Sequence, residues 1–202
     1  MSDVSAELVK DLRVKTGCGF MECKKALQES GGNMDAAVTL LRQKGLAKAA
    51  SRAGRAADQG CVESYIHAGG KIGVLVEVNC ETDFVARTDI FRLLVKNVAM
   101  HIAAANPLYV NTQDIPAEVL EKEREIYGVQ ARESGKPAHV LEKMIDGKIK
   151  KYCEEVCLLE QPYIREPEKK IADIVKEAAA AVGENIAVRR FSRFALGQSQ
   201  DN

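Results

Sequence analysis

The sequence predicts an α+β fold, on the strength of three observations. Glycines divide the first 45 residues into three short segments whose apolar residues recur with helical spacing. From Gly60 the apolar period changes to two, as in half-buried strands, and a highly charged helical stretch follows over about residues 116–158. We therefore expect four parts: a three-helix bundle over 1–45, a basic linker helix over 46–59, an α+β core domain over 60–197 and a disordered tail over 198–202.

The N-terminal bundle is expected to contain helices over about 5–17, 21–30 and 33–45, each of which ends at a glycine. Three helices in so few residues enclose only a small core, and such a unit is marginal on its own. We therefore expect the bundle to serve as a docking module.

The linker at 46–59 is rich in alanine and carries the basic residues Lys48, Arg52 and Arg55. Its composition favours a solvated helix. A contact with the phosphate backbone of RNA is the alternative, but no aromatic residues for base stacking are interleaved with the basic ones.

The core domain is expected to be built on a three-stranded antiparallel sheet. The runs 61–68 and 72–79 flank Gly69-Gly70 and predict a β-hairpin, and 186–196 supplies a third strand. Helices predicted over about 88–105 and 167–182 would cover one face of the sheet.

Helices on one face leave the other face of the sheet open, and that face carries apolar side chains such as Leu75. An exposed apolar sheet requires cover.

An antiparallel helical hairpin is predicted in the part of the sequence between the second and third strands. Its two helices cover about residues 116–133 and a stretch that ends near 158, and they are joined at Ser134-Gly135-Lys136-Pro137. Only a narrow seam between them is apolar.

Composition places the chain among globular proteins, with 46% hydrophobic and 29% charged residues. The formal net charge is zero, so no global field favours nucleic acid or membrane surfaces as partners. No apolar run is long enough to cross a bilayer, and the first residues lack the features of a signal peptide. We expect a cytoplasmic protein.

The six cysteines show no Cys-x-x-Cys pair and no metal-like spacing with histidine. Cys153 and Cys157 would share one face of a helix and could ligate a metal, but no second pair accompanies them. Reduced thiols without a bound metal are the favoured interpretation.

The stretch at residues 72–88 is the candidate functional site. It combines a period-two strand with the turn Thr82-Asp83-Phe84-Val85, at the join between strand and helix. An acid beside a large aromatic residue suits an exposed tip on a rigid base. The alternative is ordinary structure, in which Asp83 caps the next helix and Phe84 lies in the core.

Three separated motifs of this chain resemble those of the elongation factor Ts family. They occur in the expected order: Leu12-Arg13, Thr16-Gly17 and Met21 to Leu27; Thr82 to Val85; and Gly183 to Ile186 followed by Arg189-Arg190. The resemblance implies a guanine-nucleotide exchange factor for elongation factor Tu, with an N-terminal bundle of the ubiquitin-associated type and no cofactor.

The resemblance also implies roles for individual residues. Thr82, Asp83, Phe84 and Val85 would displace Mg²⁺ from elongation factor Tu. Contacts with that GTPase would be made by Leu12, Phe20, Met21 and His67, where Phe20 replaces the methionine that is common in the family.

This chain has one hairpin and one closing strand, whereas longer members of the family have two related core halves. The resemblance therefore implies a homodimer in which a second copy supplies the missing half.

Other functions have weaker support. No nucleotide-binding or hydrolase motif is present, so an enzyme is not indicated. A ubiquitin-binding adaptor would rest on the bundle alone, and an RNA-binding protein on the basic linker alone.

Overall fold

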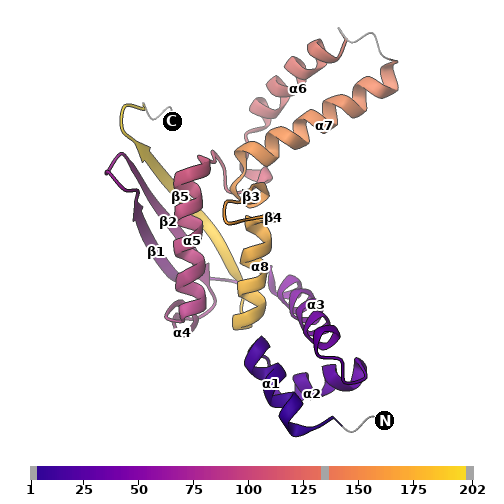
Figure 1. Cartoon of the computed structure of the whole chain (residues 1–202). Helices are drawn as coiled ribbons and strands as arrows, with labels where there is room; N and C mark the ends of the chain where they lie inside the picture. The colour runs from indigo at the N-terminus through magenta and orange to yellow at the C-terminus, as the bar shows by residue number, and fades with distance from the viewer. Residues whose placement is uncertain (1–3, 133–136, 199–202) are drawn as a thin grey trace. The chain divides into compact units, whose positions relative to one another are not determined.

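The structure is a computed structural model that describes residues 4–132 and 137–198, and it has the predicted α+β fold (Figure 1). Its α-helices are α1 (Ala6–Thr16), α2 (Phe20–Glu29), α3 (Met34–Arg52), α4 (Asp83–Ala86), α5 (Asp89–Ala105), α6 (Ala117–Arg132), α7 (Ala138–Val156) and α8 (Ile171–Val182). Its strands are β1 (Gln59–Ile66), β2 (Ile72–Cys80), β3 (Pro162–Tyr163), β4 (Glu166–Lys170) and β5 (Ile186–Ala195). Short 3-10 turns are η1 (Thr112–Asp114) and η2 (Leu158–Glu160).

The chain divides into two compact units, which are described separately. The first unit comprises Met1–Cys61, Asn79–Leu94 and Val175–Ala187. The second unit comprises Val62–Val78, Val95–Ile174 and Val188–Asn202.

In the first unit, α1, α2 and α3 form the predicted bundle. Ser5 caps α1 by accepting a hydrogen bond from the Leu8 N–H (3.2 Å), and Asn33 caps α3 in the same way. Gly17 ends α1 in the left-handed region (φ 69°), where a side chain would be strained. The core of the bundle consists of seven buried residues: Val9, Leu12, Cys23, Ala26, Leu27, Ala37 and Leu41.

Helix α3 does not end at Gly45, so the predicted division into a bundle helix and a separate linker helix is wrong at this position. The alanine-rich sequence after Gly45 favours helix strongly enough to continue it to Arg52. Gly45 itself lies against α8, because a Cβ atom at this position would be 3.4 Å from the Cβ of Ala180. The glycine therefore marks a close helix–helix approach.

The three-stranded antiparallel sheet has the strand order β1-β2-β5. Its strands start and end within two residues of the predicted limits, and the predicted turn at Gly69-Gly70 has positive φ at both glycines (89° and 68°). In the second unit, the C-terminal part of α5 packs on one face of the sheet, and Val74, Val76 and Val78 point into this core.

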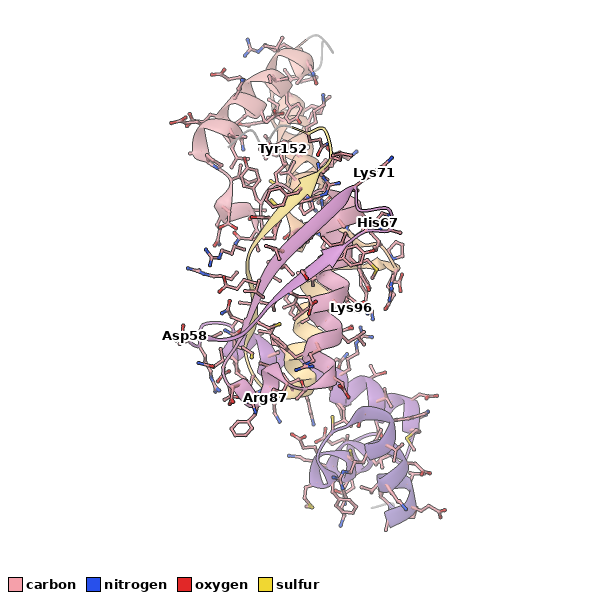
Figure 2. The ribbon with its side chains drawn as sticks, turned by 90° about the vertical axis from the view of Figure 1, so that its left-hand side faces the viewer. Asp58, His67, Lys71, Arg87, Lys96 and Tyr152 are labelled. Carbon is pink, nitrogen blue, oxygen red and sulfur yellow. The ribbon has the colours of Figure 1, made fainter. Side chains whose placement is uncertain are left out.

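The opposite face of the sheet is open in the second unit, as Figure 2 shows from that side. It exposes five large apolar side chains: Val62, Ile66, Leu75, Phe194 and Leu196. A hollow of about 520 Å³ is lined by residues of this face, including Ile66, Leu75 and Phe194. The five exposed residues are called the open-face residues below.

Helices α6 and α7 form the predicted hairpin and pack against each other along their length (Figure 1). Arg124 of α6 donates to Asp146 of α7 (3.0 Å), and the Lys148 ammonium lies 5.3 Å from the centre of the Tyr127 ring. The predicted turn at Ser134-Gly135-Lys136 lies outside the described residues, as do residues 199–202 of the predicted tail.

The predicted start of the last helix, near Pro167, is wrong. Residues 166–170 form β4, which pairs with β3 in an antiparallel register that places Pro162 opposite Lys170. Helix α8 begins only at Ile171, and Asp173 in its first turn accepts a hydrogen bond from the Lys170 N–H (3.0 Å). Tertiary pairing of this segment overrides its helical composition.

Candidate functional site

The turn between β2 and α4 directs one side chain outward and the next inward. Phe84 is 78% exposed, whereas Val85 is only 8% exposed and anchors the turn. Leaving a phenylalanine in water forgoes about 2 kcal/mol of burial free energy. The interpretation of Phe84 as a core residue is therefore wrong, and the ring lies on an exposed tip.

Asp83 starts α4 and holds its carboxylate at the surface. Arg87, one turn later, donates from Nη2 to Asp83 Oδ2 at 2.6 Å. The two side chains are 49% and 71% exposed, and Figure 2 shows Arg87 at the surface. An exposed pair of this kind contributes little stability, so the carboxylate can change partners at low cost.

Thr82 is the residue that caps α4, in place of Asp83. Its Oγ1 accepts a hydrogen bond from the Val85 N–H (3.4 Å). The same hydroxyl donates to Glu184 Oε1 (2.7 Å), and the Thr82 N–H donates to Glu184 Oε2 (3.0 Å). The base of the tip is therefore fixed by a capping bond and by two bonds to one carboxylate.

The bundle presents a second exposed apolar group at the start of α2. Phe20 is 44% exposed and Met21 is 70% exposed. Leu12, the third bundle residue predicted to contact a partner, is fully buried in the bundle core. It can support the surface from beneath but does not contribute to it.

His67 lies in the second unit, at the exposed turn between β1 and β2, where Figure 2 labels it. Its Nδ1 is 3.2 Å from the Tyr65 hydroxyl. The other seven candidate residues all belong to the first unit.

Sequence reasoning missed the residues that hold the turn in place. Besides Glu184, these are Glu81 and Asn185, which are joined by a hydrogen bond from the Asn185 N–H to Glu81 Oε1 (2.7 Å). The sequence signal for these residues is the motif from Gly183 to Ile186, which predicts the last strand and gives no indication of a contact with the turn.

Cys80, the last residue of β2, lies next to this turn. Burial and the nearby Glu184 carboxylate raise the pKa of the Cys80 thiol, so this neighbouring group stays protonated. Over residues 4–132 and 137–198, no three His, Cys, Asp or Glu side chains are grouped so that they could hold a metal ion. None of the helices in these ranges is long and apolar enough to span a membrane.

Comparison with known proteins gives a consistent result. The sequence model of the family described as Elongation factor TS matches residues 45–198. Elongation factor Ts of Carboxydothermus hydrogenoformans is 56% identical over 195 residues, which cover 96% of this chain and 90% of that protein. For Thermoanaerobacter sp. (strain X514) the identity is 56%, with 96% of each chain covered. For Syntrophobacter fumaroxidans the identity is 57%, and the match covers 96% of this chain and 98% of that protein. The chain therefore belongs to the elongation factor Ts family of translation elongation factors.

Proposed function

We propose that this protein is a guanine-nucleotide exchange factor that binds elongation factor Tu in its GDP form and promotes GDP release, so that GTP can bind. Membership of the elongation factor Ts family supports the role in translation. The observation that carries the exchange mechanism is the 78% exposed Phe84 beside a surface carboxylate, on a turn fixed by Thr82 and Val85.

The physical basis of exchange is thermodynamic linkage. If this protein and GDP each lower the affinity of the GTPase for the other, then binding of one accelerates release of the other. No covalent bond forms or breaks in this protein, so the proposal needs neither a catalytic group nor a cofactor of its own.

The tip supplies the two groups that such a mechanism needs. Phe84 would insert between helices near the nucleotide site of the GTPase, which is favourable because the ring loses water-exposed surface there. Asp83 would disturb the polar network that holds the partner's Mg²⁺. Loss of that cation leaves the phosphates of GDP poorly neutralised, and the nucleotide dissociates faster.

The bundle would provide the affinity. Phe20 and Met21 would dock on the GTPase, and Leu12 would hold α2 in place from within the bundle core. Docking of one surface raises the effective concentration of the tip at its target. His67 would add a contact from the second unit.

We further propose that the protein is a homodimer formed through the open-face residues. These side chains are 48–79% exposed and lie on a sheet face without a covering helix in the second unit. A second copy would cover them by pairing the same face with itself. Since the partner GTPase acts in translation, we place the protein in the cytoplasm.

Stopped-flow release of a fluorescent GDP analogue from elongation factor Tu tests the exchange proposal. The observed release rate should rise with the concentration of this protein and reach a plateau. A release rate that is unchanged at every concentration would refute the proposal.

A pull-down from a bacterial lysate distinguishes the exchange factor from the ubiquitin-binding and RNA-binding alternatives. Elongation factor Tu should dominate the bound fraction. Dominance of RNA, or capture of added ubiquitin with no GTPase bound, would support the adaptor or RNA-binding alternatives instead.

A further inference from the structure

Two segments of the first unit, 102–104 residues apart in sequence, exchange hydrogen bonds through their acidic side chains. The Glu184 carboxylate accepts from the backbone N–H and the hydroxyl of Thr82. In return, the Glu81 carboxylate accepts from the backbone N–H of Asn185 (2.7 Å). In each segment, a carboxylate therefore accepts a hydrogen bond from a backbone N–H of the other segment. Hydrogen bonds to a charged acceptor are stronger than those between neutral groups.

The Glu184 carboxylate acts on the geometry of the tip through the Thr82 hydroxyl. Because that hydroxyl donates its proton to Glu184, its lone pairs remain directed at the Val85 N–H. The bond to the Thr82 N–H fixes the backbone immediately before α4. These linked bonds strengthen one another in a partly buried site, and they determine how α4 leaves the strand.

The same cluster holds the segment that follows α3. The Asn185 side chain is buried, and its Nδ2 donates to the Arg55 carbonyl oxygen (2.8 Å). The Arg55 guanidinium lies 3.5 Å from Glu81 Oε2. We call Arg55, Glu81, Thr82, Glu184 and Asn185 the clamp. It joins the chain that leaves the bundle to the base of the tip.

We propose that Glu184 is a positioning residue for nucleotide exchange, which holds Phe84 and Asp83 in the orientation that acts on the partner. This inference rests on the exchange function proposed above. Glu184 does not contact the partner in this scheme; it acts through Thr82. The clamp therefore governs the maximal rate of assisted GDP release, whereas the bundle governs the concentration at which that rate is reached.

Glu184→Gln is the direct test, because glutamine keeps the size of the side chain but replaces one acceptor oxygen with a donor NH₂. If that group faces the Thr82 N–H, the bond to this donor is lost; if it faces the Thr82 hydroxyl, the bond reverses its direction and the charged acceptor is lost. We expect the maximal rate of GDP release to fall about tenfold, the effect of losing one hydrogen bond to a charged group. The half-saturating concentration should stay within about threefold of wild type.

Glu177→Gln is the matched control, since it makes the same substitution on α8 at a carboxylate that pairs with Arg42 of α3. Its maximal rate should equal that of wild type. Thr82→Val removes the hydroxyl partner of Glu184 and should reproduce the loss. The double variant should be no worse than either single one, because both substitutions break the same linked bonds.

Hydrogen exchange of the free protein provides a readout without the GTPase. The amides of Thr82 and Val85 should exchange at least about tenfold faster in Glu184→Gln than in Glu177→Gln. If Glu184→Gln shows the same amide exchange as Glu177→Gln and the wild-type maximal rate of GDP release, the positioning role is refuted. The exchange function would still stand in that case, provided that the wild-type protein accelerates GDP release. The positioning role would also be refuted if Glu184→Gln reached the wild-type maximal rate of GDP release but required a higher protein concentration to do so. If the wild-type protein fails to accelerate release, the exchange proposal fails, and equal amide exchange in the two variants would then refute the positioning role independently.

Discussion

The carboxylate of Asp83 is already occupied, because Arg87 donates a hydrogen bond to it from one helical turn away at 2.6 Å. Both side chains lie at the surface, so water and a partner protein can compete for either one. In the exchange mechanism, Asp83 must leave Arg87 before it can act on the partner. In the proposed mechanism, the ion pair would therefore slightly oppose the action of Asp83 on the partner.

Arg87→Ala should accordingly accelerate assisted GDP release by about twofold, which corresponds to the strength of an exposed pair at this helical spacing. Thermal stability should remain at the wild-type value. Asp83→Asn should slow release, since it removes the charge itself. Slower release in Arg87→Ala would show that Arg87 orients Asp83 or contacts the partner, and would contradict this account.

Phe84→Ala should lower the maximal rate of assisted GDP release by about tenfold or more, because it removes the ring that we propose inserts into the partner. The affinity for elongation factor Tu should change far less, since in the proposed mechanism the bundle supplies most of the binding. The melting temperature should not fall, because the ring is 78% exposed. Leu108→Ala, at a side chain that is 59% exposed, is the control and should leave the release rate unchanged. Wild-type release kinetics in Phe84→Ala would count decisively against the mechanism.

His101 should make stability depend on pH. It is fully buried in the second unit, where its Nε2 donates to Gln161 Oε1 (2.9 Å) and its Nδ1 accepts from the Ile164 N–H (3.4 Å). The Gln161 amide is oriented by its own bond to the Glu155 carbonyl (2.6 Å), so the ring must be neutral with its proton on Nε2. Burial lowers the pKa of His101 below its ordinary value of 6.5.

Since the unfolded chain binds the proton more readily, this contribution to stability is fully present above about pH 6.5 and is lost as the pH falls through that value towards the lowered pKa. The urea midpoint should decline between about pH 7 and pH 5, because the free energy of unfolding falls by up to about 1.4 kcal/mol for each unit of pKa shift. His101→Gln should be less stable at neutral pH but should show a flatter profile. An equally steep decline in that variant would assign the effect to other groups.

Leu75→Glu should convert the proposed homodimer into a monomer. A carboxylate placed on the apolar open face would have to be buried without a partner on association. Light scattering across a range of concentrations should show the mass fall to half of the wild-type value. Leu108→Glu is the matched control and should keep the wild-type mass. A wild-type protein that is monomeric at every concentration would refute the dimer.

The sequence predicted the parts of this fold that depend on local chemistry. Helices α1 and α3 begin directly after residues 5 and 33, where the sequence predicted their starts, and the glycine pair at 69–70 forms the predicted turn. Strand signals identified the three strands of the main sheet, along which exposure largely alternates, although only β2 and β5 contain buried residues. The local sequence left an outward tip and a buried Phe84 as alternatives, and the exposure of Phe84 in the structure decides between them.

The errors arose where a distant part of the chain decides the outcome. Gly45 resembles a helix end but lies against Ala180, and residues 166–170 have helical composition but pair with β3. Burial of Leu12 and the partnership of Thr82 with Glu184 likewise depend on contacts that no local window contains. A single sequence holds the residues of the clamp but gives no indication that they meet.

The separation of the clamp residues has a consequence for biosynthesis. Thr82 obtains its carboxylate partner from a residue that is translated 102 positions later. In a nascent chain, the tip gains its fixed shape only after the segment leading into the final strand has left the ribosome. Premature termination before Glu184 would therefore yield a product in which Thr82 lacks both bonds that fix the base of the tip.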